Sequence, residues 1–105
     1  LIDYQKTSWP IGALLLVDLM EVIPGKGHIP KKDIISTLSN FREVEEIIDV
    51  QAAEFDLVIK ARFRTLKLLS SFIETLRGIE GIEETKSAII TDETILPPSP
   101  IIRVK

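Results

Sequence analysis

Two alternating segments joined by a short turn constrain the fold of this 105-residue chain more than any other feature. Residues 44–51 and 56–64 each alternate between apolar and polar side chains, as half-buried β-strands do. A turn near Ala53 and Glu54 is short enough to join them as an antiparallel pair, whereas a parallel pair would need a long crossover. The sequence therefore predicts a β-hairpin.

The register of this hairpin follows from matching the two faces of each strand. With the turn centred near Ala53 and Glu54, apolar side chains meet on one face and opposite charges meet on the other. The predicted cross-strand pairs are Val50–Leu57, Ile48–Ile59 and Glu45–Arg62.

Helix-like and strand-like patterns flank the hairpin. Residues 13–20 are apolar in both alternations, which favours a strand covered on both sides, although a short buried helix is the competing interpretation. One helix begins near Pro30, which is acceptable in a first turn, and another runs from Thr65, a suitable N-cap, to Gly78. Residues 82–91 form the last strand. The apolar helix faces consist of Ile34, Ile35, Leu38 and Phe41, and of Leu69, Phe72, Ile73 and Leu76.

The resulting order is strand, helix, strand, strand, helix, strand. With right-handed crossovers, this order gives a ferredoxin-like split β-α-β sandwich, an α+β fold with helices on one face of an antiparallel sheet. The other face is expected to be apolar, because the first strand is apolar in both alternations and Ile47, Val58 and Ile89 can join it. Such a patch favours a dimer in which two sheets pack face to face.

Composition excludes several classes of protein. A chain of this length supports one hydrophobic core. No apolar segment approaches the roughly 20 residues of a membrane span, and a net charge of −3 argues against a dedicated nucleic-acid surface. The lack of cysteine excludes disulfides and thiolate chemistry, and it fits a cytoplasmic location. Scarce Asn and Gln are a thermophile tendency.

No arrangement of catalytic residues emerges from the sequence. His28 is the only histidine, and no second ligand or base stands at a spacing that would recruit it. The adjacent pairs Glu45–Glu46 and Glu83–Glu84 lie in strands, so each pair should divide between opposite faces. The chain is therefore expected not to be an enzyme, and to need no metal or cofactor.

Three cations alternate along one predicted strand and could bind phosphates: Lys60, Arg62 and Arg64. In the predicted register, Glu45 and Asp49 lie on the same face of the neighbouring strand. Cross-strand ion pairing is therefore the preferred interpretation.

The ends of the chain differ from its centre. We interpret residues 1–12 as an N-terminal arm, residues 13–92 as the domain, and residues 93–105 as a tail. The tail contains a stiff proline-rich spacer at 97–100 and a strand-like end at 101–105. This end could add to the sheet edge of a neighbour, or it could be a frayed terminus.

Residues 52–60, Ala-Ala-Glu-Phe-Asp-Leu-Val-Ile-Lys, resemble the Gly-x-Tyr-Asp-Leu turn and strand of the ligand-binding domain of the leucine-responsive regulator (Lrp/AsnC) family. Residues 76–90 resemble the closing segment of that domain. There an Ile-x-Gly-Val step, here residues 79–82, precedes a strand with alternating hydroxyl residues, here Thr85 and Ser87.

The beginning of the chain resembles the same domain. Residues 13–20 and the Pro24–Gly25 turn are similar to the opening strand and turn of the family, and residues 2–12 are similar to the segment that connects it to a DNA-binding domain. The resemblance thus covers roughly residues 2–91.

This resemblance implies a domain that dimerises through its sheets as a dimeric α/β barrel and assembles into higher rings, often octamers. It also implies an effector, an amino acid or related small molecule, bound between dimers at the hairpin turn and the last strand. By position, the implied effector-binding residues are Ala53, Glu54, Phe55, Asp56, Thr85 and Ser87.

Two departures from the family pattern bear on function. Ala53 stands where the family has glycine, which predicts a reshaped turn or narrower pocket and weak or altered amino-acid binding. A helix-turn-helix domain is absent, so the chain alone is expected not to bind DNA directly. The alternatives are a structural oligomerisation module without a ligand, and a dimeric α/β-barrel enzyme, which would usually carry convergent polar groups inside its barrel.

Overall fold

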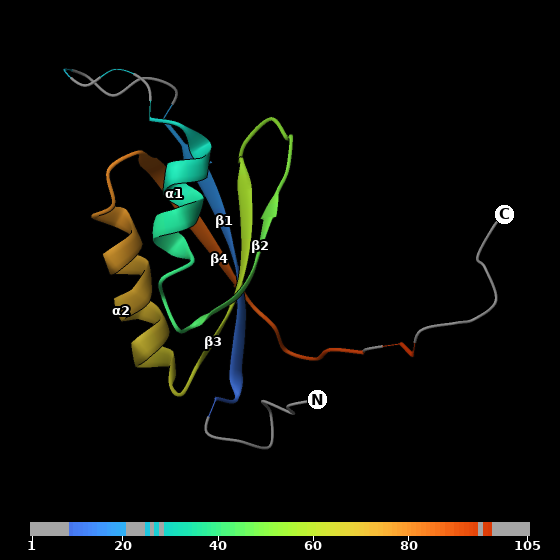
Figure 1. The fold of residues 1–105 in the computed structure, drawn as a ribbon. Coiled ribbons are helices and arrows are strands. Elements are labelled where there is room, and N and C mark those ends of the chain that lie inside the picture. Colours follow the sequence, from blue (N-terminus) through green and yellow to red (C-terminus); the bar gives the residue numbers. More distant parts are fainter. Residues whose placement is uncertain (1–8, 21–24, 26, 28, 95, 98–105) are drawn as a thin grey trace, which may run out of the picture.

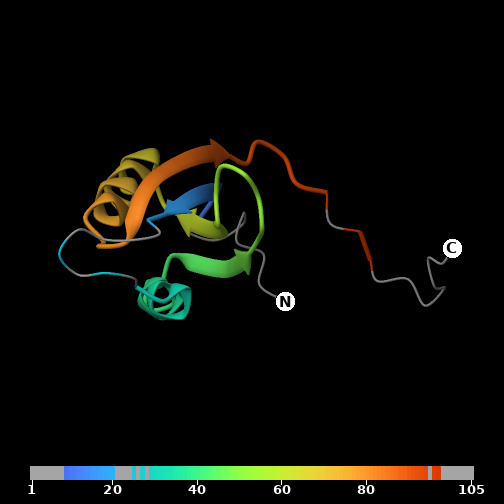
Figure 2. The same ribbon diagram turned by 90° about the horizontal axis from the view of Figure 1, so that it is seen from above.

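A computed structural model describes residues 9–20, 25, 27, 29–94, 96 and 97. Its elements follow the predicted order: β1 (Ile11–Leu19), α1 (Lys31–Leu38), β2 (Val44–Asp49), β3 (Leu57–Phe63), α2 (Leu66–Arg77) and β4 (Ile82–Ile89). The strands form one antiparallel sheet in the order β2-β3-β1-β4. Both helices cover one face, and the segment after β4 leaves on the opposite side (Figures 1 and 2). The ferredoxin-like α+β prediction is confirmed.

The helix boundaries follow from local sequence. Pro30 stands at the N-cap of α1, one position before the first turn in which the sequence placed it. Thr65 caps α2 as predicted, since its hydroxyl oxygen accepts a hydrogen bond from the backbone N–H of Leu68 at 3.1 Å. Gly78 ends α2 in the right-handed region of φ.

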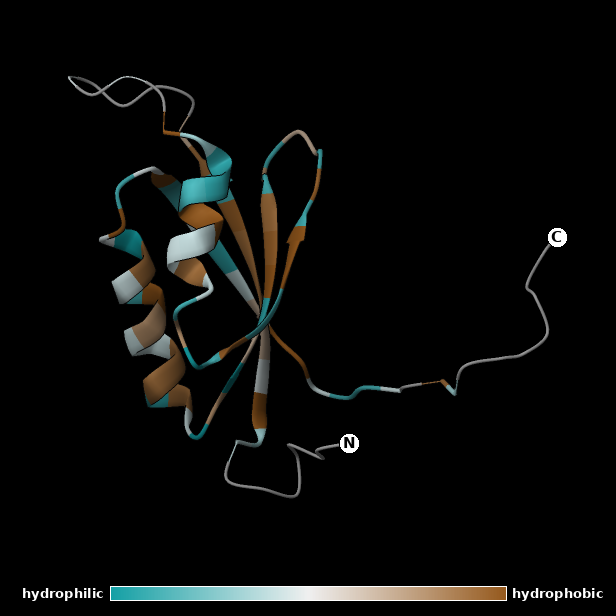
Figure 3. Cartoon of the chain, viewed as in Figure 1, coloured by the Kyte–Doolittle hydropathy of each residue, from teal (hydrophilic) through white to brown (hydrophobic). Residues whose placement is uncertain are grey.

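The hydrophobic core lies between the sheet and the two helices. Phe72 of α2 anchors it, with its ring centroid 5.2 Å from that of Phe41 and 5.3 Å from that of Phe63. Figure 3 shows apolar residues along β1 and β3 and on parts of both helices. The buried apolar residues are Ala13, Leu15, Val17, Ile34, Leu38, Leu57, Ile59, Ala61, Phe63, Leu69, Phe72, Leu76 and Ile82.

The hairpin is present, but its predicted register is wrong by one residue. In the structure Ile47 pairs with Ile59 and Ile48 with Val58. A one-residue slip moves a strand's side chains to the opposite faces, so Ile47 packs on the core while Ile48 is 42% exposed on the open face. The difference arises at the turn: Val50 donates its backbone N–H to the carbonyl of Asp56, which centres the turn on Ala53 instead of between Ala53 and Glu54. A β-bulge between Val44 and Glu46 then shifts the pairing by one further residue, so that Val44 lies opposite Ala61.

The composition of the open face also needs a correction. Ile89 pairs with the buried Ala13, so it lies on the helix-covered side of the sheet rather than on the open face. Ile47 does not belong to the open face either, for the reason given above. The large apolar side chains of the strands that do lie there are Leu14, Leu16, Ile48 and Val58.

The segment after β4 crosses part of the open face. Ile90 donates its backbone N–H to the carbonyl of Gly12 at 2.8 Å, and Glu93 contacts Lys60 at 2.6 Å and Arg62 at 2.9 Å. Gly12 eases this approach, because a Cβ there would lie 3.3 Å from both the Arg62 side chain and the Ile90 side chain, and these side chains would have to shift slightly.

The predicted cross-strand ion pairs are partly confirmed. Arg62 lies 3.4 Å from Glu45 despite the bulge. Lys60 instead pairs with Glu93, and Asp49 pairs with Lys31 of α1 at 2.7 Å. His28, residues 1–8 of the predicted arm, the end of the proline-rich spacer and the strand-like end at 101–105 lie outside the described residues.

Candidate functional site

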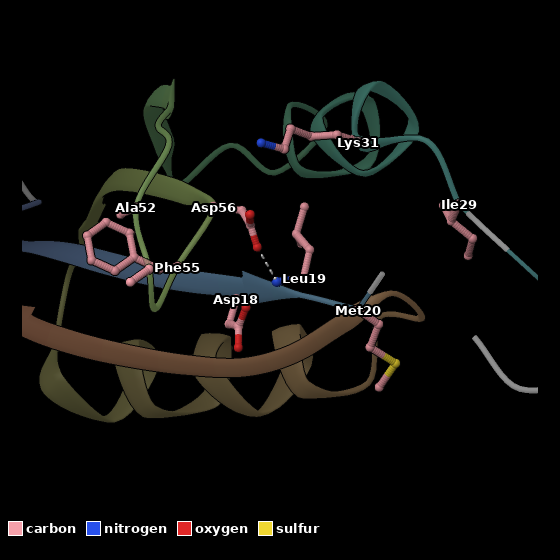
Figure 4. A pocket seen from close by; sticks show the side chains of 9 residues that line it. Asp18, Leu19, Met20, Ile29, Lys31, Ala52, Phe55 and Asp56 are labelled. Atoms are coloured by element: carbon pink, nitrogen blue, oxygen red, sulfur yellow. Dashed lines mark hydrogen bonds between the residues drawn. The ribbon is translucent and has the colours of Figure 1, made fainter. Parts of the chain in front are cut away.

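A cavity of about 260 Å³ opens where the β2–β3 turn meets the end of β1 (Figure 4). The turn contributes residues from one side, the end of β1 from below, and the start of α1 from the other side. The lining residues are Asp18, Leu19, Met20, Ile29, Lys31, Ala52, Ala53, Phe55 and Asp56.

Asp56 fastens the turn to the end of β1. Its backbone N–H donates to the carbonyl of Val17 at 2.8 Å, and its carboxylate accepts from the backbone N–H of Leu19 at 2.9 Å. Its own carbonyl accepts from Val50 across the hairpin at 3.0 Å. These three bonds fix the carboxylate at the cavity wall, where Figure 4 shows it beside Leu19.

Asp18 is the second carboxylate at this wall. Burial raises the pKa of Asp18, and the negative charges of Glu83 and Asp56, a side-chain hydrogen bond to Asp56, and the charge of Glu84 raise it further. The raised pKa favours the proton on Asp18, and a cation beside the two carboxylates would relieve their repulsion.

A β-bulge explains why both Glu83 and Glu84 act on Asp18. Asp18 pairs with Glu84 but Leu19 pairs with Ile82, so Glu83 is the extra residue. The expectation that these neighbours divide cleanly between the two faces does not hold at a bulge, because the alternation is interrupted there.

The remaining lining combines one cation with apolar side chains. The Nζ of Lys31 lies 2.7 Å from Asp49, whose side chain is 57% exposed. Leu19, Met20 and Phe55 provide apolar surface. The cavity thus offers acidic, basic and apolar walls.

The predicted site residues fall into two groups. Ala53, Phe55 and Asp56 line the cavity of about 260 Å³, and Glu54 lines a smaller one of about 90 Å³ on the open side of the turn, with Phe55 and Asp18. Thr85 pairs with Val17 and Ser87 with Leu15, which puts both hydroxyls on the helix-covered side of the sheet. One subunit therefore does not bring these hydroxyls to the turn.

Two of these positions show further detail. Thr85 is buried, and its hydroxyl has no hydrogen-bond partner among the described residues. Within the same part of the chain only glycines have positive φ, so Ala53 does not adopt that conformation.

Sequence reasoning missed Asp18 and Lys31. Asp18 was detectable, because it is the one charged residue within an otherwise apolar strand. Lys31 gave no local signal, since only the fold brings the start of α1 to the turn.

Neither a membrane-spanning helix nor a metal site is found in the described part of the chain. No helix there is long and apolar enough to cross a membrane. The His, Asp and Glu side chains there form no group that could hold a metal ion.

Comparisons with known structures identify the same fold in transcriptional regulators. A regulator from Neisseria meningitidis, solved with L-methionine, has a TM-score of 0.77 and 18% identity, over 91% of this chain and 59% of the other. A feast or famine regulatory protein from Mycobacterium tuberculosis, also complexed with L-methionine, has a TM-score of 0.76 and 20% identity, over 94% and 62%. This chain therefore spans about three fifths of the length of these two proteins.

A third structure matches over nearly its whole length. FFRP-DM1 has a TM-score of 0.62 and 30% identity, over 76% of this chain and 97% of the other. No curated protein sequence matches the chain. The family model of the Lrp/AsnC ligand binding domain matches residues 26–99. This chain belongs to the Lrp/AsnC ligand-binding domain family.

Proposed function

We propose that this chain is an effector-binding and oligomerisation domain of a transcriptional regulator, and that it senses an amino acid or a related small molecule at a subunit interface. The observation that carries the proposal is the cavity at the β2–β3 turn, where Asp18 and Asp56 face one side and Lys31 another. Family membership supports it, as do the two regulators solved with L-methionine.

The walls of the cavity are complementary to a zwitterion. An α-ammonium group beside Asp18 and Asp56 would relieve the repulsion that raises the pKa of Asp18. An α-carboxylate would reach Lys31, whose exposed pair with Asp49 costs little to exchange. The side chain of the ligand would pack on Leu19 or Phe55.

The volume of the cavity favours a small ligand. At about 260 Å³, the cavity is slightly smaller than the roughly 300–1,000 Å³ of typical sites for drug-sized ligands. A single amino acid suits this space better than a peptide or a nucleotide.

Assembly would complete the site. The open face exposes 36% of Leu14 and 42% of Ile48 in a single chain, and Leu16 and Val58 adjoin them. Packing two such faces together would form a homodimer, and further contacts a higher ring such as an octamer. Because Thr85 and Ser87 lie on the helix-covered side of the sheet, contacts between dimers, rather than the packing of the open faces, would bring them to the effector site of a neighbouring subunit.

A screen of the standard amino acids by thermal shift tests the proposal. At a free ligand concentration of about 100 Kd, binding adds about 2.7 kcal/mol to the free energy of unfolding, which raises Tm by roughly 10 °C or more for a domain of this size. Stabilisation by one or a few amino acids supports the proposal. Equal Tm values with every amino acid contradict it.

One observation favours a second candidate, a structural module without a ligand. Asp56 is already bonded to Leu19, and Asp18 to Asp56, so the wall is stable without a ligand. The outcome expected for this candidate is an intact oligomer that no amino acid stabilises.

A further inference from the structure

The opposite end of the sheet carries a separate cluster of positive charge. Trp9 precedes β1, and its ring lies 5.5 Å from the guanidinium carbon of Arg42 and 5.5 Å from that of Arg64. Arg42 precedes β2 and Arg64 follows β3, so three segments distant in sequence meet at one indole. Because β1 and β3 are antiparallel, this end is remote from the cavity at the β2–β3 turn.

Neither arginine is neutralised by the described part of the chain. Arg77 pairs with Glu74, and Lys31 and Lys60 each have a carboxylate, but no described carboxylate forms an ion pair with Arg42 or Arg64. The Trp9 ring attracts each guanidinium only modestly at an exposed site. Holding two like charges at one ring opposes that gain, and a bound anion would remove the repulsion.

A cavity lies between these groups. It has a volume of about 210 Å³ and is lined by Trp9, Arg42, Glu43, Phe63, Arg64 and Leu68. A second hollow of about 560 Å³ shares Trp9, Arg42 and Glu43 with it and is also lined by Val44, Glu45 and Arg62. Two guanidiniums at one open cavity present more donors than a single carboxylate can accept, whereas a phosphate has three or four oxygens for them.

We propose that the cavity formed by Trp9, Arg42 and Arg64 binds a phosphate oxyanion. Charge elsewhere in the domain supports this location: Asp18, Asp56, Glu83 and Glu84 gather at the other end of the sheet, so an anion is repelled there and attracted here. The oxyanion is either a free phosphate or a phosphodiester of nucleic acid. Phosphate contacts of this kind carry no sequence information by themselves.

Intrinsic fluorescence provides a direct test, because Trp9 is the only tryptophan in the chain. The full chain is titrated with sodium phosphate at constant ionic strength, and with sodium chloride in parallel. We expect a saturable change in Trp9 emission with phosphate and none with chloride. Arg42→Gln and Arg64→Gln should each weaken the apparent affinity at least about tenfold.

Arg77→Gln is the matched control, since Arg77 is an exposed arginine of α2 whose partner is Glu74. It should retain the affinity of the unmodified chain. Circular dichroism melting of each variant reports folding separately from binding. A non-saturable response, or equal affinities in all three variants and the unmodified chain, would overturn the proposal.

A short DNA duplex and an acidic peptide identify the source of the anion. Salt-sensitive DNA binding that both glutamine variants weaken supports a phosphodiester. A response to inorganic phosphate but not to DNA supports a free phosphate. A response to the acidic peptide without one to phosphate overturns the proposal, because the cluster would then recognise carboxylates.

Discussion

The carboxylate of Asp56 accepts a hydrogen bond from the backbone N–H of Leu19 at 2.9 Å, and this bond ties the β2–β3 turn to the end of β1. The two residues are 37 positions apart in the sequence. This bond lies at one wall of the candidate effector cavity. The turn to which the family resemblance points therefore also contributes to the stability of the fold.

Asp56→Ala should therefore destabilise the domain. It removes the acceptor and leaves the partly buried N–H of Leu19 unsatisfied, at a cost of about 1–2 kcal/mol in the free energy of unfolding. Glu54→Ala, which removes an exposed carboxylate of the same turn, should change it by less than about 0.5 kcal/mol. Urea unfolding of both variants measures the difference. Equal losses would contradict the role given to Asp56.

Asp18→Asn should stabilise the domain at neutral pH. The folded state raises the pKa of Asp18, so it binds the proton more tightly than the unfolded state does. The ionised form of Asp18 therefore lowers the free energy of unfolding above the folded pKa. This penalty disappears as the pH falls through the folded pKa towards the unfolded value of 3.8. Asparagine removes the charge at every pH.

The Tm of Asp18→Asn, measured between pH 3 and pH 8, should exceed that of the unmodified chain at pH 7 and converge with it in acid. Asp33→Asn in the exposed first turn of α1 is the control. A lower Tm for Asp18→Asn at pH 7 would show that the repulsion around Asp18 is not the dominant effect.

Glu93→Gln should have the opposite pH dependence. The hydrogen bond from Lys60 lowers the pKa of Glu93 most, with help from the charges of Lys60 and Arg62, although burial opposes this. The ionised carboxylate therefore contributes stability above the ordinary pKa of 4.5, and loses it as pH falls through the folded pKa. Neutralising it should cost about 1 kcal/mol at pH 7.

Thermal unfolding at pH 7 and in acid checks this prediction. Glu74→Gln, which affects the exposed pair with Arg77, should have little effect at either pH. If Glu93→Gln lowers Tm by the same amount at pH 7 and in acid, then packing rather than charge holds the segment after β4 against the sheet.

Assembly depends on the open face of the sheet. Light scattering after gel filtration should give a mass at least twice 11.8 kDa, and Leu14→Lys should lower it, because a charge would be buried between two sheets. Leu66→Lys, at a side chain that is 54% exposed on α2, is the matched control. A monomer for the unmodified chain at micromolar concentration would contradict the dimer.

The sequence predicts the hairpin, both helices and their order because these depend on local alternation and helical spacing. It does not predict the register of β2, because a turn centred on Ala53 and one centred between Ala53 and Glu54 both agree with the alternation. It does not predict the neighbours of Asp18 either, because the extra residue Glu83 shifts the pairing without disturbing the hydrophobic pattern. Contacts made through the tertiary fold are likewise inaccessible: nothing local to Glu93 indicates Lys60, and nothing near Lys31 indicates the turn.

The candidate site was predictable in part for the same reason. The turn residues Ala53 and Asp56 follow from the resemblance and line the cavity. The opposing wall from β1 and α1 does not follow, since the resemblance marks the turn and the last strand only. That Thr85 and Ser87 reach the effector site of a neighbouring subunit is a prediction about assembly.

Isothermal titration of amino acids into the unmodified chain, Asp18→Asn and Ala53→Gly tests whether the cavity at the β2–β3 turn is an amino-acid effector site. We predict saturable binding with Kd no tighter than the order of 10⁻⁴ M, about −5.5 kcal/mol. Asp18→Asn should weaken it about tenfold through the lost charge at the ammonium, and Ala53→Gly should tighten it by removing the methyl group from the cavity. No binding of any amino acid, or the same Kd in all three proteins, would contradict an amino-acid effector site at this turn.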